Sequence, residues 1–450
     1  LTSPAGGFTN TFLGASRRLK ELALANGSVV TDTYDDLGRL LSTVLTNSTG
    51  AVLNTHAYSY DAAHQRTNQT LAEGNFWQYG YDALGQLTGA QGREAGGVTN
   101  RLHEQLSYGY DAAGNLIGRT NNGFAQVFKL TNSFNQLDRV TRGGTFTAAG
   151  LVQSATNVTV TVKVNDETNG VSATMYTDRS FARSGITLIE GTNTFTAVAT
   201  DTNTRTATNI VVAWLAATNS FTYDRSGNLT SDGRRGFGYD DFDQLTSVTV
   251  TNAWRSEFKY DALGRRRVRT EKVWKNSQWV TASETRYVYD HMLVIQERDA
   301  LNLPTATYTR GLDLSGGLQR AGGIGGLLAL TLHSSLSTPH FYYHADAGGN
   351  VTALTDVRQA VVARYRYDPF GNLLGLFGPM AEANPYRFSS KEFHANSGLY
   401  YYGYRFYEPS LQRWLNRDPG GETLSPNLYR AIHSDPINVV DTMGLFTLAF

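Results

Sequence analysis

Apolar and polar residues alternate with a period of two over much of this chain. Segments such as "NVTVTVKVN" (157–165) and "QLTSVTV" (244–250) place an apolar side chain at about every second position. That period matches a β-strand, in which successive side chains point to opposite faces. Few windows show the 3.6-residue period of an amphipathic helix. The pattern therefore predicts an all-β protein with almost no helix.

A short motif separates the predicted strands and recurs along the chain. It consists of an aromatic residue, Asp, a few residues that usually include Gly, and then an apolar position, as in "YDALGQLTG" from Tyr81. Clear copies begin at Tyr34, Tyr60, Tyr81, Tyr110, Tyr223, Tyr239, Tyr260 and Tyr367. A period of about 20 to 30 residues is typical of a repeat architecture.

The chemistry of one copy predicts a β-hairpin. Tyr ends a strand, Asp begins a turn by accepting hydrogen bonds from backbone N–H groups ahead of it, and Gly adopts a positive φ. One hairpin cannot bury its aromatic face alone, so neighbouring hairpins stack. The expected result is a β-solenoid or wrapped sheet.

These repeats, which cover most of residues 31–370, resemble the YD-repeat or rearrangement-hotspot (Rhs) family, which includes the C components of insecticidal toxin complexes. The resemblance implies a YD-repeat β-sheet shell. The chain opens "LTSPAGG" without an initiator Met or a signal sequence, so we expect a partial shell truncated at its N-terminus. We assign residues 1–143 and 218–380 to the first and second parts of the array.

Residues 144–217 contain no YD motif and have a different sequence pattern. Alternating segments are joined there by "EGTN" and "DTNTR" turns. We expect an inserted immunoglobulin-like β-sandwich, because such modules consist of short alternating strands separated by turn residues. The alternative is a stretch of degenerate repeats in the same sheet.

Composition excludes several kinds of site. The 450 residues include 39 Lys plus Arg and 39 Asp plus Glu, so a zero formal charge argues against nucleic-acid binding. The absence of cysteine excludes disulfides and zinc–thiolate centres, and the nine His show no metal-ligand spacing, so we expect no metal and no cofactor. The glycine-rich "AGGIGGLLAL" (321–330) lacks a phosphate-binding pattern and indicates flexible or tightly packed backbone. The apolar runs are shorter than the roughly 18 to 20 residues of a membrane span.

Residues 381–450 carry the most specific resemblance. "NPYRFSSKEFHANSGLYYYGYRFYEPSLQRWLNRDPGG", from Asn384, is similar to the Rhs-associated core. In that family an Asp-Pro-x-Gly element and a later Asp-Pro-x-Gly-Leu element supply two aspartates for self-cleavage. Matching positions here are Asp418 in "DPGG" and Asp441 in "DTMGL", with Thr442 in place of the family's Pro. The resemblance assigns Arg417 as a supporting residue and Leu445–Phe446 as the cleaved bond.

Two neighbouring carboxyl groups can hydrolyse a peptide bond by acid–base catalysis. Two close carboxylates do not both ionise easily, so one stays protonated as an acid while the other activates water. At most, the chain is then an intramolecular aspartyl autoprotease. The alternative is that Asp418 and Asp441 only cap loops.

The expected function is to enclose and help deliver a C-terminal polypeptide, a toxin, that is absent from this chain. Partners would be that polypeptide and bacterial secretion or delivery machinery, and the protein would be secreted or exposed on the cell surface. The alternative function is a non-catalytic surface protein, structural, adhesive or carbohydrate-binding, with a glycan as its ligand. Neither function involves nucleic-acid binding or a membrane span.

Overall fold

The computed structural model describes residues 1–131, 134–153, 157–423, 425–445 and 447–449. Within these residues the regular structure consists of strands and three 3-10 turns, η1 (Phe388–Ser390), η2 (Gly421–Thr423) and η3 (Ile432–Ser434). The prediction of an all-β protein is therefore confirmed. None of the described segments forms a helix long and apolar enough to cross a membrane. The backbone divides into two compact units: unit 1 is Leu1–His56, Phe221–Arg364 and Pro379–Phe450, and unit 2 is Ala57–Ser220 and Tyr365–Gly378.

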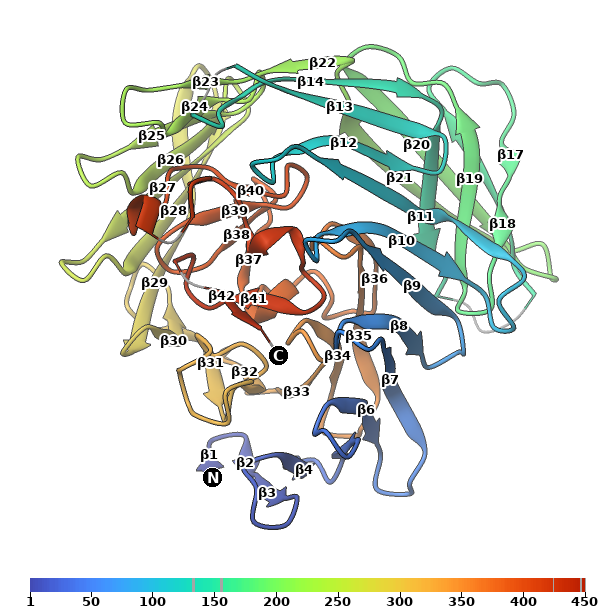
Figure 1. Ribbon diagram of the computed structural model, residues 1–450, viewed down its shortest axis with the longest axis vertical. Coiled ribbons are helices and arrows are strands. Elements are labelled where there is room, and N and C mark those ends of the chain that lie inside the picture. The colour runs from blue at the N-terminus through green and yellow to red at the C-terminus, as the bar shows by residue number, and fades with distance from the viewer. Residues whose placement is uncertain (132–133, 154–156, 424, 446, 450) are drawn as a thin grey trace. The chain divides into compact units, whose positions relative to one another are not determined.

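Unit 1 consists mainly of antiparallel strands that neighbour one another in chain order (Figure 1). Its first strands are β1 (Thr2–Ser3), β2 (Gly6–Gly7), β3 (Thr9–Phe12), β4 (Leu19–Ala23), β5 (Val29–Tyr34) and β6 (Leu40–Thr46). The longer run comprises β23 (Thr222–Tyr223), β24 (Leu229–Ser231), β25 (Gly236–Tyr239), β26 (Leu245–Val250), β27 (Trp254–Tyr260), β28 (Arg266–Lys275), β29 (Gln278–Asp290), β30 (Leu293–Arg298), β31 (Pro304–Arg310), β32 (Leu327–Leu332), β33 (His340–Ala345) and β34 (Val351–Thr355). The C-terminal segment adds the sheet β37 (Glu392–His394), β38 (Leu399–Tyr401), β39 (Phe406–Glu408) and β40 (Arg413–Trp414), and the hairpin β41 (Val439–Asp441) and β42 (Thr447–Ala449).

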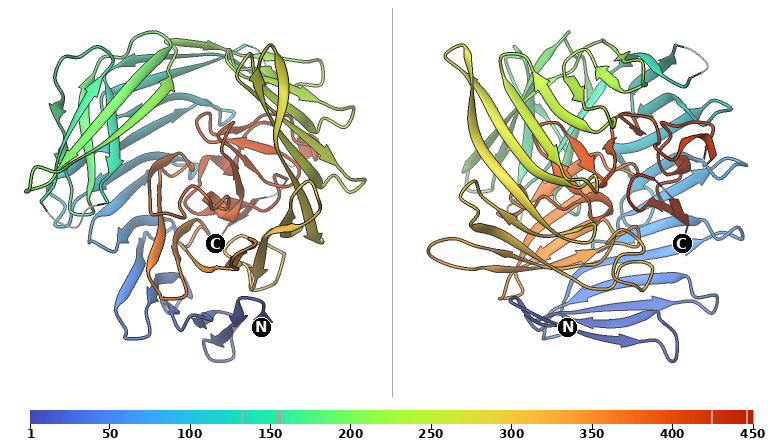
Figure 2. Two further views of the ribbon diagram at one scale, coloured as in Figure 1. Left: turned by 180° about the vertical axis from the view of Figure 1, so that it is seen from behind. Right: turned by 90° about the vertical axis from the view of Figure 1, so that its left-hand side faces the viewer.

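Unit 2 contains a second run of consecutive antiparallel strands and the inserted segment. The consecutive strands, which Figure 2 shows as adjacent blue to teal arrows, are β8 (Arg66–Leu71), β9 (Phe76–Tyr81), β10 (Leu87–Arg93), β11 (Asn100–Tyr110), β12 (Leu116–Asn121), β13 (Phe124–Leu130) and β14 (Leu137–Gly144), with β22 (Thr218–Ser220) beside β14. The inserted strands are β15 (Phe146–Leu151), β16 (Thr159–Val164), β17 (Val171–Ser172), β18 (Thr174–Met175), β19 (Ser180–Ile186), β20 (Thr192–Thr200) and β21 (Thr206–Trp214). The unit ends with β36 (Leu373–Phe377), while β7 (Val52–Tyr60) and β35 (Val361–Tyr367) contain residues of both units.

The YD motifs form the turns that the sequence predicts. At Tyr81, where β9 ends, the Oδ1 atom of Asp82 accepts the N–H groups of Leu84 and Gln86, each at 2.9 Å, and Gly85 has φ +78°. The same pair of Asp-to-amide bonds occurs at Asp35, Asp111, Asp240, Asp261, Asp346 and Asp368. The Asp carboxylate thus sets the reversal, as expected for this side chain in a turn.

A buried ion pair attaches the C-terminal segment of unit 1 to the repeat strands. Arg266 of β28 is completely buried between the rings of Tyr287 and Tyr401, at 4.5 and 4.3 Å, and it forms an ion pair with Glu392 of β37. Glu392 also accepts hydrogen bonds from Arg269 at 2.6 Å and from the Tyr287 hydroxyl at 3.0 Å. These contacts hold β37 and β38 against β28 and β29. The C-terminal segment is thereby fixed to the repeat strands of unit 1.

The inserted segment forms two sheets of its own, with strand orders β15-β19-β18 and β17-β16-β20-β21. Apolar side chains from both sheets share one core, which contains Val160, Val162, Val164, Phe181 and Ile186. The described strands of 146–214 therefore pair among themselves, whereas degenerate repeats would have continued the sheet of β8–β14. The immunoglobulin-like assignment and the boundaries 144–217 stay predictions.

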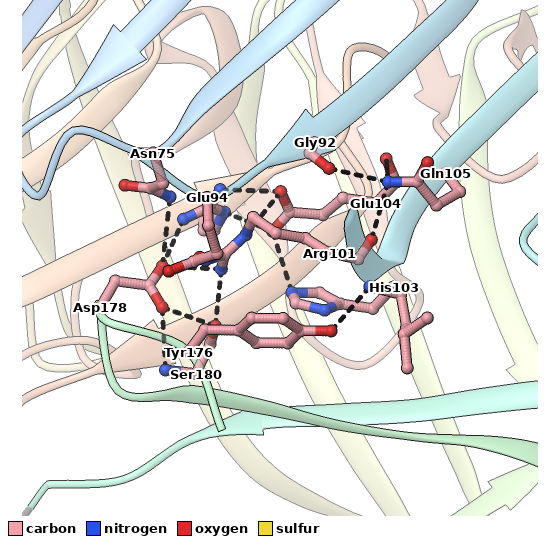
Figure 3. Close-up of polar contacts among 12 residues, drawn as sticks. Asn75, Gly92, Glu94, Arg101, His103, Glu104, Gln105, Tyr176, Asp178 and Ser180 are labelled. Carbon is pink, nitrogen blue, oxygen red and sulfur yellow. Dashed lines mark hydrogen bonds and ion pairs between the residues drawn. The ribbon is translucent and has the colours of Figure 1, made fainter. Parts of the chain in front are cut away.

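A charged network in unit 2 joins β11 to the turn before β19 (Figure 3). Arg101 is completely buried and binds Glu94, Glu104 (3.0 Å) and Asp178 (2.8 Å), while the Tyr176 ring lies 4.7 Å from its guanidinium carbon. Burial opposes ionisation of Glu104, but neighbouring positive charges, led by Arg366 of β35, hold the pKa of Glu104 well below its usual value. The buried Glu104 carboxylate is therefore charged and paired.

Candidate functional site

Asp441 organises the turn that leads to the predicted cleavage bond. It ends β41 and pairs with Thr447 of β42. Its Oδ1 atom accepts the N–H groups of Met443 (3.1 Å), Gly444 (2.6 Å) and Leu445 (3.0 Å), and Gly444 has φ +77°. One buried carboxylate oxygen thus collects the amides of the three residues before the predicted cut.

Asp418 lies in the loop between β40 and η2. Its Oδ1 accepts the N–H group of Gly420 at 2.8 Å, and its backbone N–H donates to the carbonyl of Leu428 at 3.0 Å. The Oδ2 atom accepts a hydrogen bond from Arg405 at 2.6 Å. The Asp418 side chain is 14% exposed, whereas that of Asp441 is 3% exposed. The two carboxylates therefore differ in their access to water.

Arg405 brings the two aspartates together. Its Nη2 atom lies 2.6 Å from Oδ2 of Asp418 and 3.9 Å from Oδ2 of Asp441. Its Nε donates to the carbonyl of Gly444, and its guanidinium carbon lies 4.4 Å from the centre of the Trp414 ring. A single buried cation therefore contacts both carboxylates and the peptide that precedes Leu445.

Burial shapes the protonation of this group. It raises the pKa of Asp441, although Arg405 and the three backbone amides oppose the increase. It also lowers the pKa of Arg405 to about 10, a decrease that Asp418 and Asp441 limit. Arg405 thus keeps its positive charge at neutral pH, and Asp441 is the carboxyl that holds a proton more readily than usual.

A cavity of about 380 Å³ adjoins Asp418. Its walls include Asp418, Arg417, Tyr404, Phe242 and Glu422. The Asp418 carboxyl therefore borders a space large enough for water, whereas the Asp441 carboxyl is not among its walls.

The structure brings together part of the predicted set. Asp418, Asp441 and Leu445 lie around Arg405, but the predicted supporting residue Arg417 is exposed and, within the described residues, forms no ion pair with either aspartate. Arg405 occupies the position expected of Arg417. Phe446 lies outside the described residues.

The same hydrogen bonds make Asp418 and Asp441 turn-forming residues, as the capping alternative expects. Capping and catalysis do not exclude each other, because each carboxylate has a second oxygen directed at Arg405. Among the described residues, no cluster of three or more His, Asp or Glu side chains is arranged to hold a metal ion.

Comparison with known proteins finds one matching family model and several relatives. The family described as RHS Repeat matches residues 60–99. The tRNA3(Ser)-specific nuclease WapA of Bacillus spizizenii is 32% identical over 234 residues, which cover 50% of this chain and 9% of that protein. Double-stranded DNA deaminase toxin A of Burkholderia cenocepacia is 28% identical over 240 residues, covering 50% of this chain and 17% of that protein.

This chain therefore spans less than a fifth of the length of either relative. Among solved structures, the TcdB2-TccC3-Cdc42 crystal structure aligns over 97% of this chain and 21% of its own, at 20% identity and a TM-score of 0.43. The repeat match and the sequence relatives agree with the YD motifs and their turns. The chain thus carries RHS repeats and is similar to Rhs/YD-repeat proteins, as its motifs predict.

Proposed function

We propose that this chain is part of an Rhs-type β-sheet shell that encloses a C-terminal polypeptide and frees it by aspartyl self-cleavage between Leu445 and Phe446. One observation carries the proposal: the Arg405 guanidinium contacts both Asp418 and Asp441 beside the turn that ends at Leu445. Catalyst and substrate belong to one chain, so proximity replaces a tight substrate-binding cleft.

Asp418 acts as the general base in this scheme. Asp418 borders the cavity and can therefore meet water, and its Oδ2 atom forms an ion pair with Arg405 at 2.6 Å. It takes a proton from a water molecule as the water oxygen attacks the carbonyl carbon of Leu445. Arg405 also holds the preceding carbonyl of Gly444, which limits the motion of the peptide under attack.

Asp441 acts as the general acid. Its Oδ1 is engaged by three amides, so the proton sits on Oδ2 and stabilises the oxygen of the Leu445 carbonyl. As the C–N bond breaks, Asp418 passes the proton that it took from water to the amine of Phe446. Water is thus divided between a new carboxyl group on Leu445 and a new amino group on Phe446.

The polypeptide released is a toxin in this proposal. The support comes from relatives whose names describe a tRNA nuclease and a DNA deaminase toxin. The shell would be secreted or exposed on the surface of a bacterium, with its delivery machinery as a further partner. The inserted sheets of 144–217 would be an immunoglobulin-like module on that shell.

The test is a chain with a folded fluorescent protein appended after Phe450. We expect the wild type to separate from the reporter, and Asp418→Asn and Asp441→Asn to remain joined to it on a denaturing gel. Asp261→Asn is a matched control, because Asp261 also binds two backbone amides of a turn but lies in a YD repeat, paired with Arg265. A wild type that stays intact would instead support the non-catalytic surface role.

A further inference from the structure

The glycine-rich segment singled out in the sequence is a fixed turn in the structure. It lies between β31 and β32, and Ala321 and Ile324 are completely buried. The Oδ2 atom of Asp313 accepts the N–H groups of Ala321 (2.7 Å) and Gly323 (3.2 Å). The backbone here is tightly packed, so mobility does not explain why this segment is rich in glycine.

Gly322 supplies that explanation, because it touches the Asp441 turn. It has φ +60°, and a Cβ atom built on it would lie 1.9 Å from the carbonyl oxygen of Thr442. That distance is far inside van der Waals contact, so any side chain would push the two turns apart. Only glycine lets the repeat strands approach the residue that follows Asp441.

Lys391 joins the same two backbones. It is buried, immediately precedes β37, and its Nζ donates to the carbonyls of Thr442 (2.5 Å) and Gly322 (3.0 Å). The Tyr402 ring lies 5.3 Å from Nζ, and in the described part of the chain the ammonium forms no ion pair. A buried cation held by carbonyls rather than by a carboxylate is costly, which points to a role beyond stability.

We propose that Lys391 and Gly322 form a clamp that positions Asp441 for self-cleavage and makes cleavage depend on the folding of β31 and β32 against the core. This inference rests on the proposed function. The clamp combines three separate segments: the repeat turn at Gly322, the core residue Lys391 and the turn after Asp441. Cleavage then occurs only once β31 and β32 have packed against the C-terminal segment.

Lys391 is a positioning residue, since it binds the peptide next to Asp441 and not the reacting bond. The charged groups that act on it are Asp441, Arg310 of β31 and Asp313 of the glycine turn. Burial lowers the pKa of Lys391 to about 7, and the nearby Asp441 limits the decrease. In return, the ammonium favours the ionised form of Asp441, so removing it should raise the pKa of Asp441.

The test uses the reporter fusion and compares cleavage rates of folded variants. We expect Gly322→Ala to slow cleavage by about tenfold or more, because a displacement of this size is costly for catalysis. Gly316→Ala is the matched control: it lies in the same connection with φ +71°, but its nearest neighbour is Arg17, at 3.7 Å from the added Cβ. Equal slowing by both variants would overturn the clamp.

Lys391→Met gives a readout that mere loosening of the fold would not produce. The cleavage rate of Lys391→Met should fall, and its loss of cleavage at alkaline pH should shift to a higher pH. Lys391→Arg should keep the wild-type pH dependence of cleavage. A slowed Lys391→Met with an unchanged profile would contradict the positioning role. If Asp441→Asn does not cleave while Gly322→Ala and Lys391→Met cleave at the wild-type rate, the clamp is wrong and the proposed function stands. If Asp441→Asn still cleaves, the proposed function is wrong.

Discussion

Arg405 and Arg417 show how position in a fold separates two similar residues. Arg417 adjoins Asp418 in sequence, yet it is exposed, while Arg405 is buried against Trp414 and reaches both aspartates. Arg405 stands in the "YRFYEP" run that matches the core motif, so a signal was present. The family resemblance pointed instead to Arg417, because nothing in a linear motif says which side chain turns inward.

The two arginines give a direct comparison. Arg405→Lys should reduce self-cleavage by about 100-fold, since lysine cannot reach Asp418 and the Gly444 carbonyl with one planar group. Arg417→Lys should change the rate by about twofold at most. Gel-based rates of the reporter fusion measure both, and equal losses would contradict the assignment of Arg405.

The pH dependence of cleavage follows from Asp441. Its pKa is raised mainly by burial, so the acid form persists to higher pH than that of an ordinary aspartate. The rate should fall as pH rises through that pKa, because the acid loses its proton. A cleavage rate that instead increases steadily into the alkaline range would exclude Asp441 as the acid.

At the scale of elements, the YD turn is the part of this fold that sequence predicts best. Tyr, Asp and Gly act within a few residues of each other, so local chemistry decides the result, as at Asp82 and Gly85. Contacts between distant segments are different. The approach of Gly322 to Thr442 depends on how two separate turns meet. The glycine-rich sequence alone was compatible with either flexible or tightly packed backbone.

A YD turn can be weakened selectively. Asp82→Ala should destabilise unit 2 by about 1 to 3 kcal/mol, because the amides of Leu84 and Gln86 lose their acceptor. Asp82→Asn should cost less, since the amide oxygen can replace Oδ1. Urea unfolding of both variants tests this, and equal stability of Asp82→Ala and the wild type would contradict the role of the carboxylate.

A buried histidine pair joins early and late strands of unit 1. His56 of β7 and His344 of β33 lie with ring centres 5.8 Å apart, and both contact Asn54, which also bonds Thr352. Burial lowers the pKa of His56 to about 3, and it lowers that of His344 well below the usual value. Both rings are therefore neutral in the folded protein.

This pair should make unit 1 sensitive to acid. The folded pKa values lie below the unfolded value of about 6.5, so the stabilisation is complete above that pH and decreases as pH falls toward 3. The urea midpoint should decline between pH 7 and 4. A His56→Gln/His344→Gln variant should lose part of that slope, and an unchanged slope would show that other groups cause it.

At the scale of the whole molecule, unit 2 depends on the network around Arg101. Removing one partner of a buried pair leaves uncompensated charge, so Arg101→Met should destabilise the unit by about 3 to 5 kcal/mol. Arg205→Met is the control, since Arg205 is 78% exposed in its pair with Asp201 and should cost about 1 kcal/mol or less. Thermal unfolding distinguishes the two variants.

The two units consist of segments that are far apart in the chain, such as Leu1–His56 with Pro379–Phe450. Strands and turns follow from local patterns and could be predicted from the sequence. The grouping of distant segments into two units depends on long-range contacts, which local patterns do not predict. The proposed self-cleavage site is the clearest case. Its aspartates were found by motif, while Arg405, Lys391 and Gly322 became visible only with the fold.

The intact mass of the purified reporter fusion after incubation at neutral pH tests self-cleavage at Leu445–Phe446 most directly. We expect two products, one ending at Leu445 and the other beginning at Phe446, and a single intact species for Asp441→Asn. A wild-type fusion that keeps its full mass, or a cut at another bond that Asp441→Asn does not prevent, would contradict this expectation.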